Sequence, residues 1–262
     1  MNETSQVQQI KKQLVTFKNT TSISTFNTKT LCIFGRLDKL SLNTKLQGID
    51  IIAVQKHRFY HDKKPVKYHP ANTYQLVTSS SWKNSMNASV GGVGFLLSPA
   101  AINNLIHVEP ISPRILFIEL EGNPKTTIIN AYSPHNTSPV NEVEEFYSIL
   151  KSTVKQVPAH NFLVIVGDFN ARLGPNDVNF TYNITTNRNG EMLQDFMDEF
   201  NLFSANTSFM KPRGQFWTHE NPTGDRAQLD DILFRKKWRN SVHDARSYSS
   251  FSTVGSDHRI VC

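Results

Sequence analysis

Short runs of hydrophobic residues, separated by polar segments, dominate the pattern along this chain and favour β-strands over long helices. Residues 50–54 are apolar after the first position, which is typical of a buried strand. Residues 115–120 and 126–132 flank the turn sequence Glu121-Gly122-Asn123-Pro124, which predicts a hairpin. In chain order we predict strands over residues 22–28, 50–54, 74–79, 91–97, 115–120, 126–132, 162–166, 215–218, 228–234 and 259–261.

Helical spacing of apolar residues appears in a smaller part of the chain, at 37–46, 142–157 and 191–200. In the second of these segments Val143, Phe146 and Leu150 fall on one stripe. Strands therefore outnumber helices, and several strands follow one another as hairpins. This pattern predicts an α/β (α+β) fold of four layers, with two mixed β-sheets face to face and helices outside them, and argues against a doubly wound parallel sheet.

Composition limits the class of protein to a globular domain. Hydrophobic residues make up 38% of the 262 residues, and no apolar run approaches the roughly 20 residues of a membrane helix. Segment 1–18 is polar and lacks the apolar core of a secretory signal, and only two cysteines are present. We expect a flexible segment over 1–21, one domain over 22–262 with a final strand cut short, as in a fragment, and an intracellular protein of the nucleus or cytoplasm without a membrane partner.

The charge balance adds a weak indication of the partner. The net charge is +6 and the isoelectric point is about 9.3, so the surface attracts polyanions such as nucleic acid. Many soluble proteins are mildly basic, and the charge gains weight only because the motifs below point the same way.

Polar side chains follow or enter several of the predicted buried strands. Asn27 and Tyr132 each end a strand, Asp168 follows Gly167 at the end of another, and Asp230 lies inside an apolar run. Taken singly, Asn27 or Asp168 is better explained as an ordinary turn residue. Asp230 is different, because a carboxylate between apolar neighbours needs a charged or donating partner, and His258 is a candidate for that partner.

The whole set, in this order, resembles the endonuclease/exonuclease/phosphatase superfamily, whose fold is DNase I-like. The greatest similarity is to the endonuclease domain that precedes the reverse transcriptase of non-LTR retrotransposons. The resemblance covers residues 22–262. Its strongest blocks are 50–60, 91–99, 130–134, 166–174, 228–233 and 255–259, which include Gly-Asp-Phe-Asn and Ser-Asp-His.

The resemblance implies a role in phosphodiester hydrolysis for each of these polar residues. Asp168 would activate the attacking water, Asn170 would hold that water or a phosphate oxygen, and Asn27 would fix Asp168. His258, oriented by Asp230, would stabilise the non-bridging oxygens.

The same resemblance implies that Tyr132 would hydrogen-bond the phosphate and that Asp257 would lie at or near a weakly bound Mg²⁺ or Mn²⁺. DNA is the implied substrate, and a reverse transcriptase domain in a parent polyprotein is the implied partner.

Two positions depart from the family pattern. Lys56 stands where the family has its main metal-ligating glutamate, and Asp231 stands where a tyrosine is usual. A lysine about 4 Å from the cation, at an effective dielectric constant near 20, would repel it by roughly 4 kcal/mol, which predicts impaired hydrolysis. Two alternatives remain open for Lys56: the side chain turns to solvent, or its ammonium replaces the cation and binds phosphate. Asp231 neighbours Asp230 along a strand and is therefore expected to face solvent.

Basic and aromatic residues outside this set are candidates for DNA contacts, since such residues bind phosphates and stack on bases. They are Arg58, Trp82, Lys83, Lys236, Lys237 and Arg239. The sequence thus predicts a metal-dependent DNA endonuclease of retroelement origin. Two alternatives are a catalytically dead pseudoenzyme that binds nucleic acid, and a phosphomonoesterase or phosphoinositide phosphatase of the same superfamily.

Overall fold

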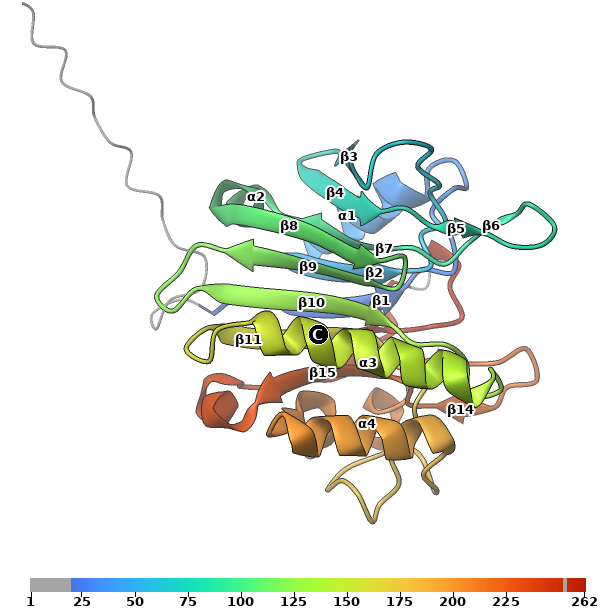
Figure 1. The fold of residues 1–262 in the computed structure, drawn as a ribbon, viewed down its shortest axis with the longest axis vertical. Coiled ribbons are helices and arrows are strands. Elements are labelled where there is room, and N and C mark those ends of the chain that lie inside the picture. The colour runs from blue at the N-terminus through green and yellow to red at the C-terminus, as the bar shows by residue number, and fades with distance from the viewer. Residues whose placement is uncertain (1–19, 252–253) are drawn as a thin grey trace, which may run out of the picture.

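Two β-sheets lie face to face in the computed structural model, which describes residues 20–251 and 254–262 (Figure 1). The first sheet has the strand order β16-β17-β1-β2-β7-β4-β3 and the second has the order β12-β15-β11-β10-β9-β8. The strands of the first sheet are β1 (Ile23–Asn27), β2 (Ile51–Gln55), β3 (Val66–Ala71), β4 (Tyr74–Ser79), β7 (Val93–Leu97), β16 (Ser247–Tyr248) and β17 (Ile260–Val261). Those of the second are β8 (Leu105–Ser112), β9 (Ile115–Leu120), β10 (Thr126–Tyr132), β11 (Phe162–Asp168), β12 (Leu202–Ser204) and β15 (Asp230–Arg235).

Helices and two small hairpins complete the fold. The hairpins are β5 (Trp82–Lys83) with β6 (Ser89–Val90), and β13 (His219–Glu220) with β14 (Arg226–Ala227). The helices are α1 (Arg36–Leu46), α2 (Pro99–Asn104), α3 (Val140–Gln156) and α4 (Arg188–Glu199), with short 3-10 turns η1 (Ala205–Thr207), η2 (Arg213–Gln215) and η3 (Lys236–Ser241). None of the helices among the described residues has the length and apolar character needed to cross a membrane.

Hydrophobic residues form three packed regions that correspond to the layers. Between the sheets, Phe95 from the first sheet packs with Ile128 and Val166 from the second. The outer face of the second sheet is covered by the apolar stripes of α3 and α4, and the outer face of the first by α1. This arrangement confirms the predicted sandwich of two mixed sheets with helices outside.

Most predicted strands and all three predicted helices are present, but residues 215–218 were predicted wrongly as a strand. This segment contains the end of η2 and a turn, in which Phe216 and Trp217 are buried. A short aromatic run can anchor a loop as well as form a strand. The edge strands β3 and β8 were missed because each contains a proline and exposed polar residues, which edge strands tolerate.

The topology brings the polar strand ends to one rim of the sandwich. β1 runs parallel to β2 and β10 parallel to β11, so Asn27 lies beside Gln55 and Tyr132 beside Asp168. β15 runs antiparallel to β11 and begins at this rim, where Asp230 lies opposite Asp168. The predicted domain boundary at 22 and the flexible segment 1–21 stay predictions, since residues 1–19 lie outside the described part.

Candidate active site

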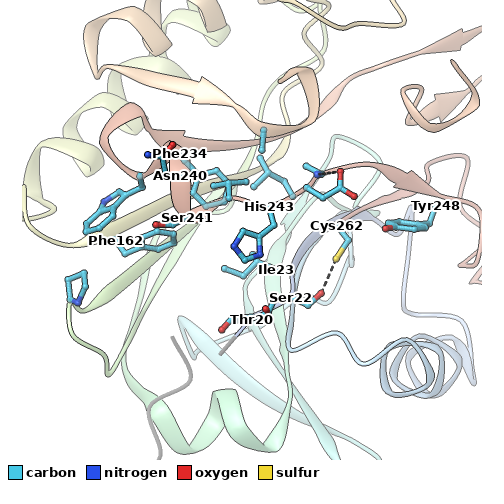
Figure 2. Close-up of a pocket in the computed structure, with 18 of the residues that line it drawn as sticks. Thr20, Ser22, Ile23, Phe162, Phe234, Asn240, Ser241, His243, Tyr248 and Cys262 are labelled. Carbon is cyan, nitrogen blue, oxygen red and sulfur yellow. Dashed lines mark hydrogen bonds between the residues drawn. The ribbon is translucent and has the colours of Figure 1, made fainter. Parts of the chain in front are cut away.

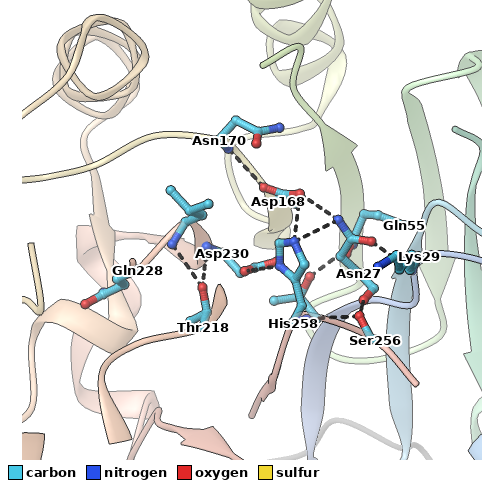
Figure 3. A network of polar contacts seen from close by, with 12 residues as sticks. Asn27, Lys29, Gln55, Asp168, Asn170, Thr218, Gln228, Asp230, Ser256 and His258 are labelled. Carbon is cyan, nitrogen blue, oxygen red and sulfur yellow. Dashed lines mark hydrogen bonds and ion pairs between the residues drawn. The ribbon is translucent and has the colours of Figure 1, made fainter. Parts of the chain in front are cut away.

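Asp168 is the fully buried acceptor at the centre of the rim (Figure 3). One carboxylate oxygen accepts a hydrogen bond from Asn27 Nδ2 at 2.8 Å, and the other accepts the backbone N–H of Asn170 at 3.0 Å. His258 Nε2 lies 3.9 Å from the oxygen that Asn27 contacts. The two hydrogen bonds fix the orientation of this carboxylate.

His258 is held on its other side by Asp230. Its Nδ1 lies 2.9 Å from Asp230 Oδ2, and both side chains are buried. Burial raises the pKa of Asp230. Burial alone would lower the pKa of His258, but the nearby carboxylates of Asp230 and Asp168 outweigh it and raise the pKa above its usual value. The imidazole is therefore fixed in orientation and biased toward the protonated form.

Asn27 connects the two sheets through these contacts. Its Nδ2 donates to Asp168 and lies 3.2 Å from His258 Nε2, while its Oδ1 accepts the backbone N–H of Lys29. The hydroxyl of Ser256 donates to its carbonyl oxygen. An amide suits this place because it donates and accepts at once without adding charge.

Tyr132 and Lys56 form the next part of the rim. Tyr132 ends β10 beside Asp168, and Lys56 Nζ lies 5.3 Å from the centre of the tyrosine ring. Burial alone would lower the pKa of Lys56, but Asp168, Tyr132 and Asp257 raise it, so this lysine is charged at neutral pH. The half-buried side chain faces the site. The alternative in which Lys56 turns to solvent is therefore wrong.

Asp257 lies at the edge of the same site. Its carboxylate is 3.1 Å from Lys29 Nζ. Burial would raise the pKa of Asp257, but His258 and Lys29 outweigh that effect and lower it, so the carboxylate is ionised. The ring of His219, on β13, lies 4.7 Å from the ring of His258.

Two groups of side chains among the described residues are close enough to hold a cation, namely Asp168, Asp230 and His258, and His219, Asp257 and His258. Neither fits Mg²⁺, which prefers hard oxygen ligands. The first group includes an imidazole, and its Asp168 and Asp230 carboxylates already contact Asn27 and His258. The second offers a single carboxylate, already paired with Lys29, beside two imidazoles. The expected Mg²⁺ or Mn²⁺ at Asp257 therefore stays a prediction.

Asn170 follows Asp168 in a left-handed backbone conformation, with φ 49°. Its backbone N–H binds the Asp168 carboxylate, and its side-chain amide donates to the Ser133 carbonyl at 2.9 Å. The turn interpretation and the functional interpretation of these residues are therefore compatible, because the turn fixes the Asp168 carboxylate.

The predicted DNA contacts fall into two sets. Trp82 and Lys83 belong to the β5–β6 hairpin, which projects past the rim (Figure 1). The guanidinium carbon of Arg114 lies 4.6 Å from the Trp82 ring centre and 5.2 Å from that of Tyr132, so this hairpin adjoins the site. Arg58 lies two residues after Lys56, and its backbone N–H donates to Gly91 at the base of the hairpin.

Lys236, Lys237 and Arg239 lie elsewhere, at the opposite end of the sandwich in η3, after the far end of β15. They are not brought to the polar rim, and a DNA-binding role for them stays a prediction. This end also carries a pocket of about 660 Å³ between Ile23, Phe162, Phe234 and Cys262 (Figure 2). The pocket lies at the starts of β1 and β11 and so has no contact with the polar network at their ends.

Asp231 does not face solvent, which corrects the sequence-based expectation. It does lie on the opposite face of β15 from Asp230, but α3 and α4 cover that face, so only 2% of Asp231 is exposed. The hydroxyl of Ser204 donates to it at 2.7 Å, and burial raises its pKa to about 6.

The structure adds residues that the sequence patterns did not single out. Thr218 Oγ1 accepts the backbone N–H of Asp230, and Lys29, His219 and Arg114 line the rim. Lys29 is two residues after Asn27, so its place at a strand end was a usable signal. His219 and Arg114 belong to segments with no buried-strand pattern and reach the site only through the tertiary fold.

Comparisons with known proteins agree with this architecture. The model of the family described as "Endonuclease-reverse transcriptase" matches residues 126–262, more than half of the chain. The chain belongs to the endonuclease/exonuclease/phosphatase superfamily. Members of this superfamily are nucleases and phosphatases, whose common chemistry is the hydrolysis of phosphate esters.

Similar curated proteins include craniofacial development protein 2 from Tragulus javanicus and from Bos taurus, each 29% identical over 177 residues. These matches cover 65% of this chain, which spans about 30% of the length of either relative.

Several solved structures share the fold of this superfamily. The 3′ phosphatase NExo from Neisseria aligns with a TM-score of 0.70 and 20% identity over 92% of this chain and 98% of its own. The AP endonuclease LMAP from Leishmania major aligns with a TM-score of 0.69 and 12% identity, over 95% of this chain and 90% of its own. The endonuclease domain of TRAS1, a telomere-specific non-LTR retrotransposon, aligns with a TM-score of 0.63 and 13% identity, over 91% of this chain and 94% of its own.

Proposed function

We propose that this protein hydrolyses phosphodiester bonds of DNA, as an endonuclease whose rate is impaired by Lys56. The observation that carries the proposal is the convergence of Asn27, Asp168 and His258 in one network of polar contacts. Asp168 is 141 residues and His258 is 231 residues from Asn27 along the chain. The carboxylates of Asp168 and Asp230 accept, and the Asn27 amide and the His258 imidazole lie between them, at one rim of the sandwich. Such an arrangement suits a reaction in which water loses a proton while charge builds on phosphate oxygens.

The side chains divide the chemistry between them. Asp168 accepts the proton of the attacking water, and Asn27 keeps the carboxylate aimed. His258, held by Asp230, donates to a non-bridging oxygen and stabilises the charge that develops there. Tyr132 lies beside Asp168 and places its hydroxyl at the same rim, where it hydrogen-bonds the phosphate.

DNA is the proposed substrate because the basic chain carries Trp82 and Lys83 on a hairpin next to the site. We also propose a retroelement origin and an association with a reverse transcriptase domain, supported by the description of the matching family and by the shared fold of TRAS1. The relatives named craniofacial development protein 2 point instead to a context outside retroelements. An intracellular location in the nucleus or cytoplasm remains part of the proposal.

Nicking of a supercoiled plasmid tests the function directly. We expect slow conversion to the open circle by the unmodified protein and at least a 100-fold loss in Asp168→Asn and His258→Ala, since each removes a group that acts on the phosphate or water. Parallel reactions with MgCl₂, MnCl₂ and EDTA show whether a divalent ion matters. Nicking that survives unchanged in both variants would sink the proposal.

A second function is favoured by the ion pair between Lys29 and Asp257, because it occupies the carboxylate that a cation would need. In that case the protein binds DNA without cutting it. The absence of nicking by the unmodified protein and by Lys56→Glu, together with submicromolar DNA binding, would establish this second function and exclude the first.

A further inference from the structure

Two lysines lie side by side just beyond the ends of the parallel strands β1 and β2. The strand pairing continues past the strand ends, since Thr28 N–H donates to the Gln55 carbonyl at 3.0 Å and Leu31 N–H to the His57 carbonyl at 3.1 Å. Lys29 lies between Thr28 and Leu31 in the first segment. Lys56 lies between Gln55 and His57 in the second. Both lysines have left-handed backbones, with φ 61° and 55°, which is uncommon for residues other than glycine.

Both ammonium groups reach the polar site, although half of the Lys29 side chain is exposed to solvent and Lys56 is the more buried of the two. Lys29 Nζ contacts Asp257 at 3.1 Å, and Lys56 Nζ lies against the Tyr132 ring. The charge of Lys56 is stabilised by Asp168, Tyr132 and Asp257 against the effect of burial, which leaves its pKa raised. Asp257 therefore interacts with both lysines.

A divalent cation placed beside Asp257 would meet two ammonium groups. At an effective dielectric constant near 20, an ammonium about 4 Å away repels a unit charge by roughly 4 kcal/mol. Solvent around the half-exposed Lys29 reduces its share, but both groups act against a cation. A phosphate oxygen in the same place meets the opposite sign of field. An ammonium is a compact point charge with donors that rotate freely, and such groups commonly bind phosphate.

We propose that Lys29 and Lys56 stand in place of a divalent cation, so that their ammonium groups hold a nucleic-acid phosphate in this site without any metal. The inference rests on the proposed function only for the class of ligand, a phosphodiester of DNA. Asp257 then serves to position Lys29, and His258 contacts the same phosphate from the opposite side.

DNA binding in the absence of metal provides the first test. The probe is a fluorescein-labelled DNA duplex, followed by anisotropy in EDTA and in MgCl₂, with KCl used to match ionic strength. The unmodified protein should bind in EDTA at least as tightly as in MgCl₂. The Lys29→Ala/Lys56→Ala variant should bind about 10-fold more weakly, and the slope of log affinity against log salt should fall by about 2.

A matched variant controls for net charge. Lys45→Ala/Lys125→Ala removes two exposed lysines from the opposite end of the sandwich, near the starts of β2 and β10, and should lose little affinity and little salt slope. If the lysines at the site only neutralise Asp257, the two double variants will behave alike, and the proposal is wrong.

Metal binding provides the second test and does not depend on DNA. Mn²⁺ is titrated and free ion followed by electron paramagnetic resonance. We expect no saturable site in the unmodified protein at submillimolar Mn²⁺ and one new site in Lys29→Asp/Lys56→Glu, where carboxylates replace both ammonium groups. Stoichiometric Mn²⁺ binding by the unmodified protein, displaced by Mg²⁺, would overturn the inference.

These tests are separate from the proposed function because neither measures cleavage. A protein that never nicks plasmid can still hold phosphate through the lysines. A protein that nicks only with Mg²⁺ bound will show a stoichiometric Mn²⁺ site, which overturns the inference and leaves the proposed function standing. Thermal melting of each variant establishes that it folds. If the doubly acidic variant unfolds, the alanine pair in EDTA alone still decides the outcome.

Discussion

His258 Nδ1 lies 2.9 Å from Asp230 Oδ2, and both groups are buried beneath the rim of the site. The contact fixes which imidazole nitrogen faces inward and leaves Nε2 pointing toward Asn27 and Asp168. Since Asp230 touches the imidazole and not the proposed phosphate position, it is a positioning residue. Its contribution should therefore appear in the rate and in the behaviour of His258.

Asp230→Asn should reduce plasmid nicking strongly, by up to about 10⁴-fold, because the carboxylate fixes the tautomer of the functional histidine and stabilises its charged form. The carboxylate is also what raises the pKa of His258, so the histidine should titrate at a lower pH in the variant. Nuclear magnetic resonance of the imidazole protons measures that shift. A normal rate together with an unchanged titration would contradict the positioning role.

Asp231→Asn should change how stability depends on pH. Asp231 has a pKa of about 6 in the folded protein, against about 3.9 in an unfolded chain. The folded state therefore holds a proton that the unfolded state has lost between these values, and stability falls as pH rises through 6. The difference of roughly two units corresponds to about 3 kcal/mol at 1.36 kcal/mol per unit.

The variant lacks this titration, so we expect it to match the unmodified protein near pH 4 and to be more stable at pH 8 by up to about 3 kcal/mol. Urea unfolding at both pH values measures the difference. The exposed Asp195→Asn on α4 is the control and should shift neither. Equal stabilities of the Asp231 variant and the unmodified protein at pH 8 would mean that this carboxylate is not buried as described.

Gly167→Ala should damage both stability and the site. A Cβ atom at this position would lie 1.8 Å from the Ala131 carbonyl oxygen, which is backbone and cannot move away without separating β10 from β11. We expect a loss of about 3 kcal/mol or more in the free energy of unfolding, at the upper end of overpacking costs. Calorimetry measures it, and a loss below about 1 kcal/mol would show that the strand pair yields easily.

Trp82→Ala should weaken DNA binding more than it weakens nicking of bound DNA. The Trp82 ring lies under Arg114, which also covers Tyr132, so the hairpin and the rim present one continuous surface. Loss of one stacked base costs roughly 1–3 kcal/mol, or about 10- to 100-fold in affinity. Anisotropy and single-turnover nicking separate the two effects. The exposed Met86→Ala at the tip of the same hairpin is the control and should leave affinity unchanged.

Local residue patterns were enough to predict the central strands and the main polar residues of the site. Apolar runs of strand length marked β2 and β11, because strands buried on both faces carry few polar residues. Polar residues at strand ends marked Asn27 on β1 and Asp168 on β11. Asp230 and His258 were paired in advance because a buried carboxylate needs a partner. The order of apolar and polar residues predicts these features because it reflects which residues are buried.

The neighbours that each residue meets across the fold could not be predicted from these patterns. Alternation placed Asp231 on the opposite face of its strand from Asp230, but the helices α3 and α4 packed on that face, and not the strand itself, exclude water from it. The position of Lys29 against Asp257, and of Lys56 against Tyr132, likewise joins segments far apart in the chain. Burial and charge at these places depend on long-range neighbours, and a one-dimensional pattern does not specify which neighbours they are.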